Sequence, residues 1–130
     1  ISALDFKDIT MDSHALMAEA RRSGGIAVPA HPGRHGIGLA EWMAQGVEFP
    51  GLRIVERLNA GNRPEEQERA HQLADEMGYL GIGGSDSHFV SSIARCMTQF
   101  PDGIGDEKDL VGALLDGNFR PVHLEETLKK

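Results

Sequence analysis

The sequence predicts an α/β fold in which parallel strands are joined by helical crossovers. Apolar runs of strand length alternate with helix-length amphipathic segments about three times along the chain. Capping residues open the helical segments and glycines close them. With 130 residues, the chain suits one small domain or part of a larger one. It opens at Ile1, without a methionine, and we therefore expect residues 1–130 to be a single domain or a fragment of one.

The first half of the chain predicts two helices and two strands. Thr10 is the expected N-cap of a helix over 11–22, and a strand over 26–31 follows it. A short helix over 38–45 ends at a glycine and leads to a strand over 52–58. Each apolar run is short and is followed by turn-forming residues, which is typical of buried strands.

The second half continues the alternation. Asn62 and Glu65 resemble a capping box, and the helix that they open runs to Met77 with apolar residues on one face. The other predicted elements are a strand that ends near Ile82, a short strand over 94–100, a helix from Asp106 through Leu115 and a final strand over 119–124.

Composition excludes several classes of function. Thirteen basic against twenty acidic residues give a net charge of −7, which argues against sequence-independent binding to nucleic acid. The sequence shows no apolar run of membrane-spanning length and no signal peptide, so we expect no membrane partner. Cys96 is the single cysteine, which excludes an internal disulfide and favours a cytoplasmic location.

Ligand-type side chains follow two of the predicted strands. His31 stands at the end of the first, and Asp86 and His88 follow the strand that ends near Ile82. Because the carboxyl ends of parallel strands meet at one edge of a sheet, these residues predict a metal site there. On an extended strand Asp86 and His88 would leave the same face about 6.6 Å apart, which suits adjacent metals. The alternative is that Asp86 caps a turn and His31 is an ordinary hydrogen-bonded histidine.

Arg34 and His35 follow His31 in a predicted loop over this site. A guanidinium can hold a phosphate through two parallel hydrogen bonds, and an imidazole could reach a leaving group. We therefore predict that both residues bind substrate, the alternative being that they belong to a solvated loop.

Three motifs in this order resemble the C-terminal half of the PHP family, the polymerase and histidinol phosphatase superfamily, and the resemblance runs from about residue 11 to 122. They are Ala30-His31-Pro32 after a glycine-led strand, Val55-Glu56-Arg57-Leu58-Asn59 on the next strand, and Gly84-Ser85-Asp86-Ser87-His88 after the third. The resemblance implies the C-terminal part of a distorted (β/α)7 TIM-like barrel that hydrolyses phosphoesters with up to three divalent metal ions.

Carried over by position, the resemblance implies that His31, Asp86 and His88 are metal ligands, each serving a different ion. It implies that Glu56 orients a ligand or a water molecule. The alternative is that Glu56 is a strand-end glutamate that bonds neighbouring backbone amides. Histidine and carboxylate ligands suit Zn, Mn or Fe. The family's opening His-x-His motif does not occur in this sequence, so we expect the N-terminal half of the barrel to supply the remaining ligands.

These inferences predict metal-dependent phosphoester hydrolysis by a complete PHP domain, with this chain alone inactive. The substrate would be a small phosphorylated compound or a nucleotide. A sheet edge left unpaired by the missing half would favour association with a second copy. Two alternatives stay open: a non-catalytic PHP-like or PHP-associated module, and a metal hydrolase of non-phosphate substrates.

Overall fold

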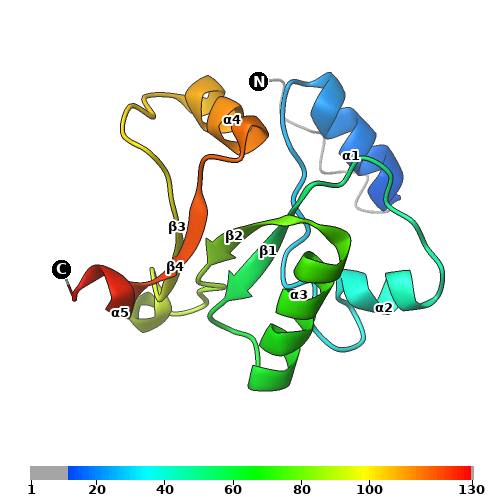
Figure 1. The fold of residues 1–130 in the computed structure, drawn as a ribbon, viewed down its shortest axis with the longest axis horizontal. Coiled ribbons are helices and arrows are strands. Elements are labelled where there is room, and N and C mark those ends of the chain that lie inside the picture. Colours follow the sequence, from blue (N-terminus) through cyan, green and yellow to red (C-terminus); the bar gives the residue numbers. More distant parts are fainter. Residues whose placement is uncertain (1–11, 130) are drawn as a thin grey trace.

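A computed structural model describes residues 12–129 and shows an α/β fold. In Figure 1, α1, α2 and α3 lie on one side of the strand pair β1–β2, and β3, β4, α4 and α5 lie on the other. The elements are α1 (Ser13–Arg22), α2 (Leu39–Ala44), β1 (Ile54–Asn59), α3 (Pro64–Met77), β2 (Leu80–Gly84), the 3-10 turn η1 (Val90–Ser92), β3 (Cys96–Gln99), α4 (Glu107–Asp116), β4 (Arg120–His123) and α5 (Leu124–Thr127).

The helices begin close to their predicted positions, with two differences in capping. Asp12 caps α1 by accepting a hydrogen bond from the His14 amide; the predicted cap, Thr10, lies outside the described residues. For α3 the N-cap is Arg63, whose amide donates to the Glu66 carboxylate at 3.0 Å, so the predicted capping box at Asn62 and Glu65 is wrong by one residue. Asp106 caps α4, as predicted.

The pair β1–β2 is parallel, with α3 as its crossover, which confirms the predicted strand–helix–strand unit. Ile54 pairs with Leu80 and Asn59 with Gly84, and a bulge interrupts the register between Glu56 and Leu58. Val55, the second residue of β1, is fully buried, and Leu39, Leu52 and Ala74 complete the core around it. Both strands therefore end at the same edge of the sheet, as the crossover requires.

Residues 26–31 do not form the predicted strand. The segment is joined to β1 by a backbone hydrogen bond from the Glu56 amide to the Pro29 carbonyl, at 3.1 Å. Pro29 and Pro32 have no amide hydrogen, so the segment cannot supply a regular ladder. It nevertheless brings the next residues, from His31 on, to the carboxyl end of β1.

The last strand pair also differs from the prediction of parallel strands, because β3 and β4 are antiparallel. This strand pair is attached to β2 through Thr98, whose hydroxyl accepts from the Gly83 amide at 3.0 Å and donates to the Gly83 carbonyl at 2.9 Å. Within residues 12–129 the strands thus form two two-stranded sheets, and no closed barrel is present.

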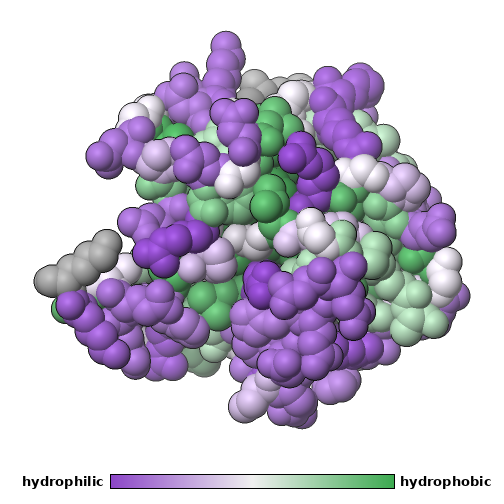
Figure 2. All heavy atoms as spheres, in the orientation of Figure 1, coloured by the Kyte–Doolittle hydropathy of each residue, from purple (hydrophilic) through white to green (hydrophobic). Residues whose placement is uncertain are grey.

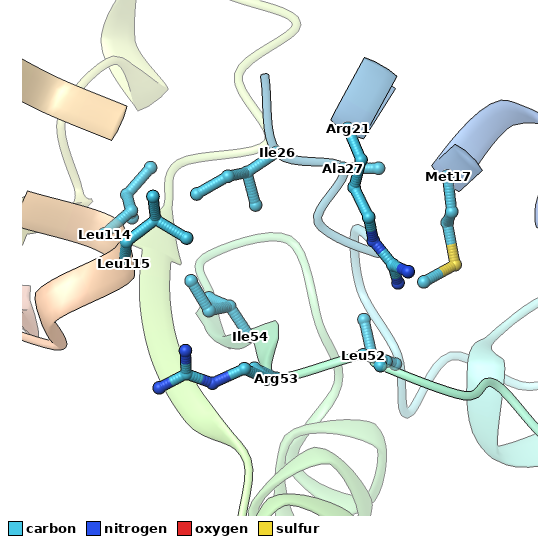
Figure 3. Close-up of a pocket in the computed structure, with 10 residues that line it drawn as sticks. Met17, Arg21, Ile26, Ala27, Leu52, Arg53, Ile54, Leu114 and Leu115 are labelled. Carbon is cyan, nitrogen blue, oxygen red and sulfur yellow. The ribbon is translucent and has the colours of Figure 1, made fainter. Parts of the chain in front are cut away.

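Hydrophilic side chains gather over the region of α3 in the view of Figure 2. A cavity of about 80 Å³ lies between α1, the beginning of β1 and the end of α4 (Figure 3). Its walls are mainly aliphatic, and none of the predicted site residues lines it. None of the helices within residues 12–129 is long and apolar enough to cross a membrane.

Candidate active site at the carboxyl ends of β1 and β2

Glu56 connects the turn at His31 to strand β1. Its side chain is buried, and Oε2 accepts hydrogen bonds from the His31 amide at 2.6 Å and from Asn59 Nδ2 at 2.8 Å. A buried carboxylate is tolerated when donors of this kind surround it. Glu56 therefore holds the backbone of a predicted metal ligand, through the kind of backbone-amide contact that the alternative interpretation of this glutamate describes.

The β-bulge in β1 explains how Glu56 and Asn59 meet. Side chains three residues apart in a regular strand point to opposite faces of the sheet. The extra residue between Glu56 and Leu58 shifts this alternation, and the two side chains come within hydrogen-bond distance. The bulge thus directs two buried polar groups to the same end of the sheet.

Arg34 and Asp86 form an ion pair across this end of the sheet. Arg34 Nη2 lies 2.6 Å from Asp86 Oδ2, and their side chains are only 23% and 20% exposed. The same Nη2 lies 3.4 Å from Asn59 Oδ1 and 3.3 Å from Asn62 Oδ1. A continuous hydrogen-bonded network thus runs from the His31 backbone through Glu56, Asn59 and Arg34 to Asp86.

The backbone at both ends of this network is in an unusual conformation. His31 has φ of 33° and Asp86 has φ of 48°; among the described residues other than glycine, only Ala94 in the loop before β3 shares this property. Left-handed backbone at such residues costs about 1–2 kcal/mol each and persists where the surroundings impose it. Since Asp86 lies beyond the end of β2, the prediction that Asp86 and His88 share a strand face is wrong.

Two glycines provide the space that the acidic side chains occupy. A methyl group on Gly84 would overlap Glu56 Oε1, and one on Gly61 would lie 2.6 Å from Asp86 Oδ2. Gly84 ends β2 and Gly61 follows β1, so both belong to the edge that carries the site. Any larger residue at either position would displace a carboxylate of the site.

The histidines at the site have nitrogen atoms that the described residues do not use. His31 Nδ1 is buried and has no hydrogen-bond partner among residues 12–129. His88 is exposed, and its Nδ1 lies 2.8 Å from the Asp86 carbonyl, so that Nδ1 donates and Nε2 carries the lone pair. This is the usual arrangement of a metal-binding histidine, whose second nitrogen donates to a carbonyl or carboxylate.

These groups fit a divalent cation in their chemistry. An unpaired buried nitrogen is costly, and a bound cation would satisfy it. Within residues 12–129, however, no three His, Cys, Asp or Glu side chains are placed to hold one ion together. Since metal sites in proteins generally use three or more ligands, an ion at His31, Asp86 or His88 requires ligands from elsewhere.

The Arg34 guanidinium lowers the pKa of the Asp86 carboxyl by donating a hydrogen bond to it. The imidazoles of His31 and His88 lower this pKa further, while partial burial opposes the shift. Both imidazoles thus act on the same carboxylate. Asp86 is therefore anionic at neutral pH, which is the form that binds a cation.

The structure does not bring the His35 side chain to this network. Its amide donates to the buried Glu66 carboxylate at 3.2 Å, but its ring faces Glu41 and Arg69, with Nδ1 3.7 Å from Glu41 Oε1. Asn59 and Asn62, in contrast, contact Arg34 although the sequence did not suggest them as site residues. The only signal for Asn59 was its place three residues after Glu56 at the end of a strand, which is also typical of turn formation.

Comparison with known proteins gives one family. The PHP-associated family model matches residues 64–119, a span that includes Asp86 and His88 but not His31, Arg34 or Glu56. No curated protein and no solved structure matches the chain. Residues 64–119 are thus similar to the PHP-associated family, which confirms the predicted resemblance of this chain to the C-terminal region of PHP-superfamily proteins.

Proposed function

We propose that this chain supplies part of the active site of a complete PHP domain that hydrolyses phosphoesters with divalent metal ions. The observation that carries the proposal is the hydrogen-bonded network that joins the His31 backbone to Asp86 where β1 and β2 end. Because open α/β sheets and α/β barrels place their active sites at this edge, the network lies where catalysis is expected.

In this proposal His31, Asp86 and His88 hold Zn, Mn or Fe ions together with ligands from the rest of the domain. When bound, the ions would lower the pKa of a water molecule and neutralise charge on the phosphoryl oxygens. Glu56 fixes the His31 backbone, and Arg34 binds a phosphoryl oxygen of the substrate. His35 remains a sequence-based prediction for substrate binding, which would require its ring to turn away from Glu41.

The proposal includes a fold and partners. We infer that 26–31, β1 and β2 lie side by side in the C-terminal part of a distorted (β/α)7 TIM-like barrel, whose N-terminal half is the partner of this chain. A strand edge left unpaired without that half would favour pairing with a second copy. The substrate would be a small phosphorylated compound or a nucleotide, and the buried free thiol of Cys96 suits the cytoplasm.

A non-catalytic PHP-associated module is the second candidate. It is favoured by the ion pair of Asp86 with Arg34, which uses one oxygen of a proposed metal ligand. In such a module the network would serve only to hold the turn at His31 against β1 and β2. The two candidates differ in whether Asp86 affects catalysis.

Hydrolysis of an aryl phosphate with added Mn²⁺ would distinguish them. A complete PHP domain that contains this chain is expected to lose at least about 100-fold in kcat/KM on His31→Ala or Asp86→Ala, since each removes a metal ligand. The exposed His14→Ala serves as the control and should leave the rate unchanged. The chain alone is expected to show only background hydrolysis. Unchanged activity of the Asp86→Ala domain would contradict the proposed function.

A further inference from the structure

We propose that the Arg34–Asp86 ion pair is a latch that couples cation binding to oxyanion binding at this site. While the ion pair is formed, Arg34 competes with a cation for Asp86, and Asp86 competes with an oxyanion for Arg34. A cation that takes Asp86 frees Arg34, and an oxyanion that takes Arg34 frees Asp86. The inference rests on the proposed function, because it assigns the cation to Asp86 and the oxyanion to Arg34.

The geometry of Arg34 carries the first part of the argument. Its contacts with Asp86, Asn59 and Asn62 all use Nη2, at 2.6, 3.4 and 3.3 Å. Among the described residues, no acceptor contacts Nη1 or Nε. A guanidinium presents two parallel N–H groups either through Nε and Nη2 or through Nη1 and Nη2, so an oxyanion held in this way competes with Asp86 for Nη2.

The carboxylate shows the same division between used and unused atoms. Asp86 Oδ2 accepts from Arg34, whereas Oδ1 has no donor within residues 12–129. A divalent cation at Oδ1 would lie close to the positive guanidinium, and this repulsion must be relieved for the cation to bind well. This repulsion is relieved when the Arg34 side chain rotates away from Asp86 toward an oxyanion, or when a mutation removes the guanidinium.

The partial burial of the pair makes the coupling measurable. Exposed ion pairs contribute little because water and salt screen them. Here both side chains are about four-fifths buried, and the hydrogen bond is short and charge-assisted. By linkage, the factor by which an oxyanion raises cation affinity equals the factor by which the cation raises oxyanion affinity.

The test measures free Mn²⁺ by electron paramagnetic resonance in titrations of the 130-residue chain, with and without inorganic phosphate. Arg34→Met is expected to raise Mn²⁺ affinity about tenfold, the cost of displacing a charge-assisted hydrogen bond. Arg69→Met is the matched control, because it removes a cation from an ion pair of similar burial, with Glu41, outside the site. Its effect should stay below about twofold, as expected for a change in net charge screened by salt.

Phosphate provides the second comparison, after correction for its own Mn²⁺ binding in protein-free samples. It should raise the Mn²⁺ affinity of the unmodified chain at least threefold and have no such effect on Arg34→Met. Equal affinities in the unmodified chain and Arg34→Met, or equal phosphate effects in both, would overturn the latch. If Asp86→Asn still weakened Mn²⁺ binding in that case, the proposed cation site would stand without the latch. If Asp86→Asn changed nothing in any background, both proposals would fall.

Discussion

Replacement of Gly33 by alanine is expected to destabilise the chain by about 3 kcal/mol, at the upper end of the usual cost of overpacking. Gly33 is buried in the turn that follows His31, and a methyl group there would overlap the Glu66 carbonyl and lie 2.7 Å from the Ala70 amide nitrogen. Both are backbone atoms of α3, which cannot move aside as the end of a flexible side chain can. The turn must therefore lift off the helix.

Urea unfolding of Gly33→Ala measures this effect, and Gly112→Ala is the matched control. Gly112 lies within α4, where a methyl group would meet open space, so alanine should stabilise the chain by up to about 1 kcal/mol. A loss below about 1 kcal/mol for Gly33→Ala would show that the turn at His31 is free to shift, contrary to the packing described above.

Removal of the Glu56 side chain is expected to cost about 2–3 kcal/mol. Glu56→Ala deletes the acceptor of the His31 amide and of Asn59 Nδ2, and unsatisfied buried donors carry a desolvation penalty of about 1–3 kcal/mol. Glu56→Gln keeps the shape and one acceptor oxygen, so its cost should be below about 1 kcal/mol. The exposed Glu76→Ala should change stability by less than about 0.5 kcal/mol.

The His31 amide reports the same contact directly. Its proton should exchange slowly in the unmodified chain and rapidly in Glu56→Ala, because its hydrogen bond to Oε2 is lost. Equal stability of Glu56→Ala and Glu56→Gln, with no change in exchange at His31, would show that Glu56 does not hold the turn.

The local signals in the sequence predicted much of the fold. Helix caps at Asp106, glycines at helix ends and the apolar runs of β1 and β2 placed these elements to within a few residues. The strand predicted over 26–31 is wrong because Pro29 within it and Pro32 just after it outweigh the apolar pattern of the segment. The orientation of β3 and β4 depends on long-range pairing and on the Thr98 contact to Gly83, which no local pattern encodes.

The site was predicted in its residue types more than in its contacts. His31, Glu56 and Asp86 belong to one hydrogen-bonded network at the edge where β1 and β2 end. The ion pair of Arg34 with Asp86 cannot be predicted from the sequence, because both residue types also bind external ligands. His71 on α3 likewise accepts a hydrogen bond from Arg57 Nε on β1, at 3.0 Å. Pairs so far apart in sequence arise only from tertiary packing.

The most direct test of a cation site at this edge is paramagnetic broadening of histidine signals in the 130-residue chain on addition of Mn²⁺. The account predicts that the imidazole signals of His31 and His88 broaden first, and that Asp86→Asn raises the Mn²⁺ concentration this requires. His14, His71 and His123 serve as internal references and should remain sharp. Uniform broadening of all histidines, or sharp signals at His31 and His88 while the references broaden, would contradict it.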